Sequence, residues 1–158
     1  MFSVLSWKRS ELGVVVGVLV FIFGISFYQV KLGEMKTRDA QRKSDVEMVA
    51  RGLRKYFADY GIYPAEATGS GRIVACGYMG RDTCEWGGGQ VVDVDGVTYI
   101  NKLPDDPLSG KGYKYIYRPA ADRQSFRIYV GLENRADKDF KTDLNVWCGE
   151  VRCRWYVE

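Results

Sequence analysis

Histidine is absent from all 158 residues of this chain, which narrows the range of possible functions. Without histidine the chain lacks the commonest general base, the commonest metal ligand and any Ser-His or Cys-His nucleophilic arrangement. No pair of carboxylates and no nucleophile beside a base stands out either. We therefore expect that the protein is not an enzyme.

A strong excess of one charge is also missing, and proline is scarce. The 23 basic and 20 acidic residues give a formal net charge of +3, so composition gives no reason to expect nucleic acid as a partner. Of the four prolines, none precedes Pro64. Nothing therefore forces a helix to end in the segment before it.

An uncharged apolar run occupies residues 12–28, and nothing else in the chain is as apolar. At about 1.5 Å per residue it covers roughly 26 Å, slightly less than a hydrocarbon core of about 30 Å. Flanking residues close the gap, so we expect a transmembrane helix over residues 11–30, with the membrane as a partner. A buried core helix and a cleavable signal peptide are the alternatives. A core helix would show a polar face, and residues 24–26 form a poor cleavage site.

Residues 31–60 are rich in helix formers, and we expect them to continue the helix. Residues 31–45 carry charges on all sides, which indicates a solvated stalk. Beyond them an apolar stripe with helical spacing predicts a face that covers a sheet. Its residues are Val46, Val49, Leu53, Tyr56, Phe57 and Tyr60. Gly61, directly after the stripe, predicts the C-terminal cap of the helix.

The rest of the chain, residues 61–158, forms the predicted domain. Residues 61–96 are rich in glycine and lack a period, so they predict a long loop with one short strand near its end. Later segments alternate in period two and predict an antiparallel pair and a third strand. The predicted strands are residues 90–94, 113–117, 125–130 and 151–157. A long helix followed by a small antiparallel sheet is an α+β fold, with the helix on one face of the sheet.

The four cysteines fall in two local pairs, Cys76 with Cys84 and Cys148 with Cys153. An even number in a small exported domain indicates disulfides, although the sequence does not choose between local and crossed pairing. Zinc is the alternative, but structural zinc sites use tighter pairs of ligands, often with histidine. Persistent disulfides require a domain outside the cytoplasm.

The charges around the apolar run favour the opposite orientation. Two basic residues precede the run, whereas five follow it within residues 31–43, and the positive-inside rule assigns that side to the cytoplasm. We give the cysteines more weight and expect residues 1–10 to be a short cytoplasmic tail or leader. The chain is then a single-pass protein of the cell membrane with an extracytoplasmic domain.

Four motifs in order resemble type IV pilins, especially the major pseudopilins of type II secretion. They are residues 38–45 (RDAQRKSD), 56–64 (YFADYGIYP), 99–107 (YINKLPDDP) and 112–117 (GYKYIY). The similarity covers residues 11–132, and the helix exit YGIYP and the turn LPDDP are its most specific elements. The resemblance implies a subunit that polymerises through its apolar N-terminal helix, with other pilin-like subunits as partners.

The resemblance also implies a processed N-terminus, cut between Ser6 and Trp7. Glu11 would then be the fifth residue of the mature chain, where the family has a glutamate. In the family this carboxylate pairs with the N-terminal amine of a neighbouring subunit. Lys8 and Arg9 depart from the family pattern, which has apolar or small residues there. The alternative for Glu11 is an acidic residue at the first helical position, after an N-cap at residue 10.

Major pseudopilins bind calcium in an acidic C-terminal loop, and the resemblance suggests Asp137, Asp139 and Asp143 as candidates here. Carboxylates are the hard oxygen ligands that calcium prefers. Basic residues alternate with these aspartates, however, which is typical of a solvated loop, and we expect no cofactor. Cys148 and Cys153 resemble the C-terminal disulfide loop of many pilins.

Two functions follow from the sequence. In the first, the protein is a structural subunit of a pilus-like or pseudopilus-like filament, and Gly13 and Gly17 allow its helix to pack closely against copies of itself. In the second, it is a membrane-anchored, non-polymerising module that binds a surface through residues 76–89, which display Tyr78 and Trp86. Self-association separates the two, because only the first requires contacts between copies of the helix.

Overall fold

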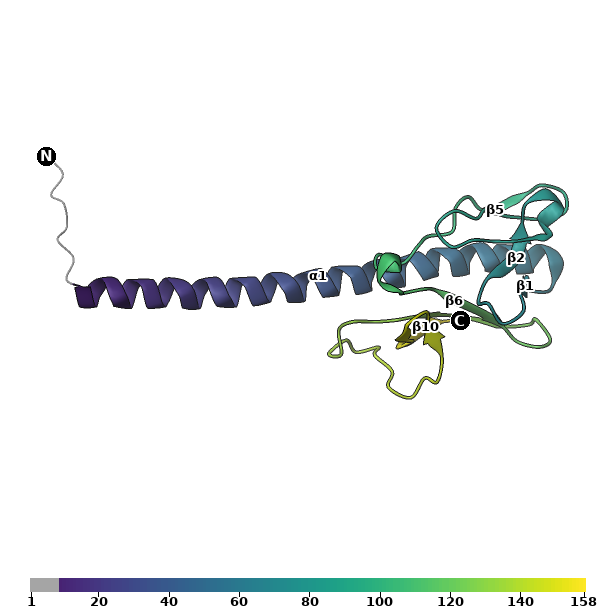
Figure 1. Cartoon of the computed structure of the whole chain (residues 1–158). Helices are drawn as coiled ribbons and strands as arrows, with labels where there is room; N and C mark the ends of the chain where they lie inside the picture. Colours follow the sequence, from purple (N-terminus) through teal and green to yellow (C-terminus); the bar gives the residue numbers. More distant parts are fainter. Residues whose placement is uncertain (1–8) are drawn as a thin grey trace, which may run out of the picture.

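The computed structural model describes residues 9–158, which fold as one long helix beside small antiparallel sheets (Figure 1). The helix, α1 (Arg9–Tyr60), contains 52 residues. At about 1.5 Å per residue its length is about 78 Å. The predicted α+β fold and the predicted continuous helix are confirmed. Ser10 lies inside α1, so the prediction that residue 10 caps the helix from outside is wrong.

The two halves of α1 have different surroundings. The first half is long and apolar enough to cross a membrane, and no other described residues bury it. The second half runs along the domain (Figure 1). It ends at Gly61, which has a φ of +68° and whose N–H donates to the carbonyl of Phe57 at 2.7 Å. The predicted glycine cap is confirmed.

The apolar stripe on the second half of α1 lies in the core of the domain. Val46, Val49 and Leu53 are fully buried. Tyr56 and Phe57 pack against the same core and are partly buried. The last residue of the predicted stripe, Tyr60, is 37% exposed and stacks on Tyr56 with a centroid distance of 4.7 Å. The buried part of the stripe therefore ends at Phe57, one turn earlier than predicted, although the helix continues to Tyr60.

A three-stranded sheet in the order β10-β7-β6 lies on one side of α1. Its strands are β6 (Ile116–Pro119), β7 (Phe126–Val130) and β10 (Trp155–Val157), and both pairs are antiparallel. The predicted pairing of residues 113–117 with 125–130 is confirmed, but β6 begins three residues later than expected. Tyr113 instead forms an isolated bridge to Gly149.

The predicted strand 151–157 is divided. Its first part, β9 (Val151–Arg152), pairs with β8 (Trp147–Cys148), and its last part is β10. The chain changes partner between them, since the N–H of Cys153 donates to Val146 whereas that of Arg154 donates to Val130. One continuous strand cannot satisfy both neighbours.

Residues 61–96 are more ordered than the predicted loop. They contain a three-stranded sheet of β1 (Ala65–Glu66), β2 (Ile73–Cys76) and β3 (Asp82–Thr83), and the strand β4 (Val91–Val92), which pairs with β5 (Thr98–Ile100). Two short 3₁₀ helices, η1 (Tyr78–Gly80) and η2 (Ser109–Lys111), complete the domain. Strands of two residues are too short to produce a period in the sequence, which explains the error.

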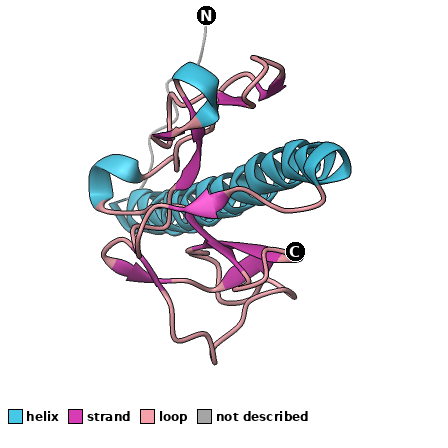
Figure 2. Ribbon diagram, turned by 90° about the vertical axis from the view of Figure 1, so that its right-hand side faces the viewer, coloured by secondary structure: helices cyan, strands magenta, loops and turns pink. Residues whose placement is uncertain are grey.

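The domain covers α1 from more than one side, rather than forming a single sheet under it. Figure 1 shows β5 and β10 on opposite sides of the helix, and the view along α1 shows strands and loops on both sides of it (Figure 2). The hairpin of β4 and β5 contacts α1 closely at Gly52, where an added Cβ would lie 2.3 Å from Cγ1 of Ile100. The buried side chains of both sides form one core around the second half of α1.

Candidate functional site

A buried cluster of charges joins α1 to the domain at the end that faces the apolar half of the helix. Its centre is Arg42, whose side chain is fully buried. Nε and Nη2 of Arg42 donate to the two carboxylate oxygens of Asp106 at 2.8 and 3.0 Å. Nη1 donates to Asp39 at 2.8 Å and to Glu133 at 2.7 Å. One guanidinium therefore binds carboxylates from three segments of the chain.

Two further interactions complete the cluster. Arg38 forms a bidentate pair with Glu133, with distances of 2.8 and 2.7 Å. Asp39 accepts the backbone N–H of Glu133 and that of Asn134, the latter at 2.8 Å. Because these groups are satisfied by one another, the charges of Asp39 and Arg42 can be buried.

Hydrogen bonds within the cluster shift the pKa values of Arg42 and Glu133. Burial alone would lower the pKa of Arg42, but the hydrogen bonds to Asp106 and Glu133 outweigh burial and raise that pKa. The hydrogen bond from Arg38 lowers the pKa of Glu133, and Arg42 adds to the effect. Both shifts favour the charged forms of Arg42 and Glu133, so the cluster holds the domain on the helix electrostatically.

The prediction of a solvated stalk over residues 31–45 is thus wrong from Arg38 onward. The stalk is shorter, and Asp39 and Arg42 belong to the domain interface. The sequence signal was the i, i+3 spacing of this opposite-charge pair, which places both side chains on one face of the helix. Their partners, Asp106 and Glu133, are too distant in sequence for that spacing to reveal.

Two of the three residues suggested as calcium ligands, Asp137 and Asp139, form ion pairs with a lysine of the same chain. Nζ of Lys43 lies 2.7 Å from Asp137 and 2.8 Å from Asp139, and it lowers the pKa of Asp137. Asp143 is exposed and takes no part in this contact. Among residues 9–158, no group of three or more acidic, cysteine or histidine side chains is arranged to hold a metal ion. Lys43 supplies the positive charge that a metal would otherwise bring.

The four cysteines form two local disulfides, which resolves the connectivity that the sequence left open. Cys76 is bonded to Cys84, and Cys148 is bonded to Cys153. The first closes the loop that contains η1, and the second closes the hairpin of β8 and β9. Zinc binding by these thiols is excluded in this state, because each sulfur is bonded to another.

The first disulfide loop displays an aromatic side chain. Tyr78 is 85% exposed, and the next residue, Met79, adopts a left-handed backbone with a φ of +57°. Gly77 also has a positive φ, of +67°, and an added Cβ there would collide with Asp82. The backbone of this loop therefore has little freedom, and Tyr78 is held away from the domain as the sequence predicted.

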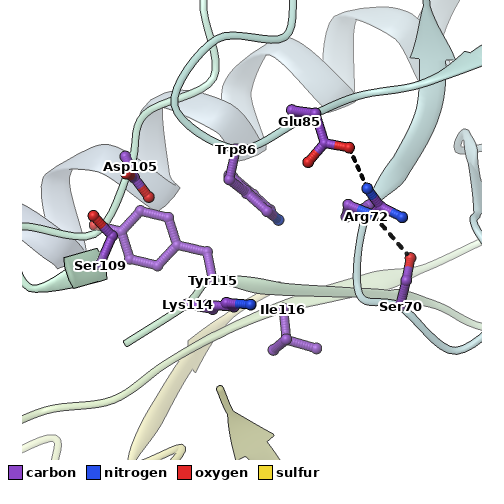
Figure 3. Close-up of a pocket in the computed structure, with 9 residues that line it drawn as sticks. All are labelled: Ser70, Arg72, Glu85, Trp86, Asp105, Ser109, Lys114, Tyr115 and Ile116. Atoms are coloured by element: carbon purple, nitrogen blue, oxygen red, sulfur yellow. Dashed lines mark hydrogen bonds and ion pairs between the residues drawn. The ribbon is translucent and has the colours of Figure 1, made fainter. Parts of the chain in front are cut away.

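Trp86 is half-buried in the wall of a cleft of about 460 Å³ (Figure 3). Its Nε1 donates to the carbonyl of Gly71 at 3.2 Å, and its ring meets Tyr115 edge-on with a centroid distance of 5.4 Å. Charged and hydroxyl groups form the rim of the cleft, namely Ser70, Arg72, Glu85, Asp105, Ser109 and Lys114. An aromatic wall with polar groups of both signs suits a small polar ligand or a polar side chain of a partner.

The residues predicted to act in assembly lie at the far end of α1. An added Cβ at Gly13 or Gly17 would meet no atom within 4 Å, so both glycines face open space on the apolar half. Glu11 lies in the first turns of α1. The predicted cleavage between Ser6 and Trp7 lies outside the described residues.

Comparisons with known proteins add no relative, because no family model, no curated protein and no solved structure matches this chain.

Proposed function

We propose that the protein is a structural subunit of a pilus-like or pseudopilus-like filament, anchored in the cell membrane by the first half of α1. One observation carries the proposal, namely a single unbroken helix that is bare and apolar over one half and fixed to a folded domain over the other. Such a rod can pass from lipid into a bundle of identical rods without refolding. The buried Arg42 cluster supports this role, since it ties the domain to the rod.

The orientation in the proposal follows from the disulfides. Both bonds need an oxidising compartment, which favours a domain outside the cytoplasm. The positive-inside rule favours the opposite orientation, and it counts basic residues rather than net charge. In the proposed orientation, three of the five basic residues within residues 31–43 are paired with carboxylates of the domain, namely Arg38, Arg42 and Lys43.

The experiment that tests the proposal measures self-association of the full chain in lipid vesicles by chemical crosslinking. Lipid tails are as apolar as the helix, so association in a membrane depends on close packing, which Gly17 permits. We expect a ladder of oligomers from the natural chain and a severalfold shorter ladder from Gly17→Leu. Val15→Leu is the control, because residue 15 lies on the opposite side of α1 from Gly17 and Gly13. A natural chain that remains monomeric at high density would refute the proposal.

A second measurement addresses processing. Intact mass of the protein from its native membrane distinguishes a mature chain that starts at Trp7 from one that starts at Met1. Reduction is expected to add the mass of four hydrogens, since two disulfides are present. A chain that starts at Met1 would leave an unprocessed subunit and remove the proposed role of Glu11 beside a new N-terminal amine.

A non-polymerising binding module is the second candidate function, and the cleft at Trp86 favours it. This module would use the aromatic wall of the cleft and the exposed ring of Tyr78. It predicts a monomer in vesicles whose intrinsic tryptophan fluorescence changes when a ligand enters the cleft. Trp86→Ala would abolish that change, and the chain would stay monomeric in vesicles with or without the substitution.

A further inference from the structure

The domain has an end remote from the apolar half of α1, which we call the tip. It consists of the last turn of α1, the disulfide loop of residues 76–84 and the turn of residues 93–97 (Figure 1). The OH of Tyr99 joins the turn to the helix, since its one hydrogen lies between two carboxylate acceptors, Asp59 at 2.7 Å and Asp93 at 3.1 Å. The loop touches the hairpin at Gly80, where an added Cβ would lie 2.5 Å from a backbone oxygen of β4.

The tip combines exposed apolar side chains with negative charge. Tyr78 is 85% exposed, and Val97 and Val94 are 51% and 49% exposed. The loop and the turn together contain three acidic residues and one basic residue, namely Asp82, Asp93, Asp95 and Arg81. Exposed apolar groups that lie together with charges around them are typical of a surface that contacts another protein.

The tip is also rigid, which favours binding because little conformational entropy is lost. The disulfide closes one of its segments. In the other, the Oδ1 atom of Asp93 accepts the backbone N–H of Asp95 at 2.9 Å and that of Val97 at 2.8 Å. Both turns therefore hold their exposed side chains in place before any contact forms.

The opposite end of the domain, which we call the base, faces the apolar half of α1. It consists of α1 residues 31–38, η2 and the loop of residues 133–140, and the Arg42 cluster and Lys43 fix the last two segments to the helix. Figure 1 shows η2 and this loop at that end.

The base carries cations without partners. Its acidic residues are paired, Glu34 with Lys31, Glu133 with Arg38, and Asp137 with Lys43. Four basic residues of the base form no ion pair within residues 9–158, namely Lys36, Lys111, Arg135 and Lys138. The carboxylate of Glu150 lies beside Gly112 at the end of η2.

We propose that the acidic, apolar tip of one copy docks on the basic base of the next copy, so that the domains join head to tail. The inference rests on the proposed filament function and names the contact that the domains would make in it. Complementary charges at the two ends of one chain fit copies that point in the same direction. A head-to-tail contact does not close on itself, and its repetition generates an open assembly. Tyr78, Val94 and Val97 then lose their exposure to water.

Charge reversal in the full chain tests the docking in detergent micelles, where copies are not held at one depth as they are in a bilayer and the tip of one can reach the base of another. Asp95→Lys at the tip and Lys138→Glu at the base each place like charges in the contact, and each is expected to shorten the ladder of crosslinked oligomers by about tenfold. The double variant restores opposite charges and is expected to recover most of the ladder. Both residues are exposed, so both variants keep the fold, which circular dichroism checks. Lys55→Glu is the control, since Lys55 is exposed on α1 between the two ends.

The outcomes separate this inference from the function on which it rests. Single and double reversals that polymerise like the natural chain would overturn the docking and leave the filament in place. A natural chain that stays monomeric would overturn both. Tyr78→Ser sharpens the result, because docking predicts a shorter ladder, whereas an unchanged ladder would assign Tyr78 to the binding of another surface.

Discussion

In the first half of α1 apolar side chains are exposed, and in the second half charged side chains are buried, which is the reverse of the usual pattern. In the membrane half, Phe21 and Phe23 are 69% and 73% exposed in the isolated chain. In the domain half, Asp39 and Arg42 are almost completely buried. The comparison shows that the two halves of one continuous helix suit different surroundings. The first half is apolar enough to cross a membrane, as the proposed anchor requires, whereas the second half is held by its own domain.

The buried charges are tolerated because their hydrogen bonding is complete. Removing an ion pair from water costs several kcal/mol for each ion, so an incomplete pair in this position would destabilise the domain. Here no buried side-chain polar atom among the described residues lacks a partner. Every change that leaves one member of the cluster unpaired is therefore expected to affect the domain half and to leave the membrane half unchanged.

The largest effect is expected from Arg42→Met. This variant keeps an unbranched apolar side chain but leaves the buried carboxylates of Asp39 and Asp106 without their cation, which costs about 3–5 kcal/mol. Urea unfolding of the full chain in detergent, followed by near-ultraviolet circular dichroism, measures the loss. Lys43→Met is the matched control, because Lys43 is partly exposed and its pairs contribute about 1 kcal/mol or less. Equal losses in the two variants would contradict a special role for the buried cluster.

A smaller loss is expected from Gly52→Ala. The new Cβ would lie 2.3 Å from Cγ1 of Ile100 and 3.0 Å from the carbonyl oxygen of Tyr99. Overpacking of this kind costs about 1–3 kcal/mol, against a gain of at most about 1 kcal/mol from helix propensity. Unfolding should therefore show a net loss, and this loss should be smaller in a background of Ile100→Ala, because alanine lacks the Cγ1 atom that the new Cβ meets. A gain in stability would mean that β5 moves away from α1 without penalty.

The sequence predicted the features of α1 and of the central strands that depend on local spacing. The long helix, the buried stripe at Val46, Val49 and Leu53, and the glycine cap all have a period or a position that can be read along the chain. The pairing of β6 with β7 was predicted for the same reason. Each of these signals is produced by neighbours in sequence.

The features that the sequence did not predict depend on partners far apart in the chain. From the sequence, Arg42 was assigned to a solvated stalk, because its partners Asp106 and Glu133 lie 64 and 91 residues away along the chain. The strands β1 and β3 contain two residues each and are defined by their pairing with β2. The disulfide connectivity likewise depends on where the backbone brings each cysteine. Among site residues, Tyr78 was predicted as exposed because its loop is rich in glycine.

Acid should weaken the domain half selectively. The pKa values of Glu133 and Asp137 are lowered in the folded chain by hydrogen bonds from Arg38 and Lys43 respectively. Carboxylates whose pKa is lowered on folding increase the free energy of unfolding at pH values above their unfolded pKa of about 4. This contribution is lost as the pH falls from that value through the lower pKa of the folded state. Asp45 acts in the opposite sense, because burial raises its pKa.

Hydrogen exchange of residues 133–139 between pH 6 and pH 3, scaled for intrinsic rates, measures the weakening. We expect protection of this loop to fall below about pH 4, whereas the uncharged run of residues 12–28 keeps its protection. Glu133→Gln is the control that should reduce the dependence on pH, because it removes the titrating group. Equal loss of protection in both halves would show that the helix unfolds as one unit.

The smallest effect is expected from Gly33→Ala, at the boundary between the two halves. An added Cβ there meets no atom within 4 Å, so the variant gains helix propensity of at most about 1 kcal/mol without a steric penalty. The gain should increase protection from exchange around residue 33 and leave urea unfolding of the domain unchanged. The opposite signs of Gly33→Ala and Gly52→Ala in one helix would then separate a free stalk from a docked one. A loss at Gly33 would mean that this part of α1 must bend, and the two halves would act as hinged segments rather than as one rod.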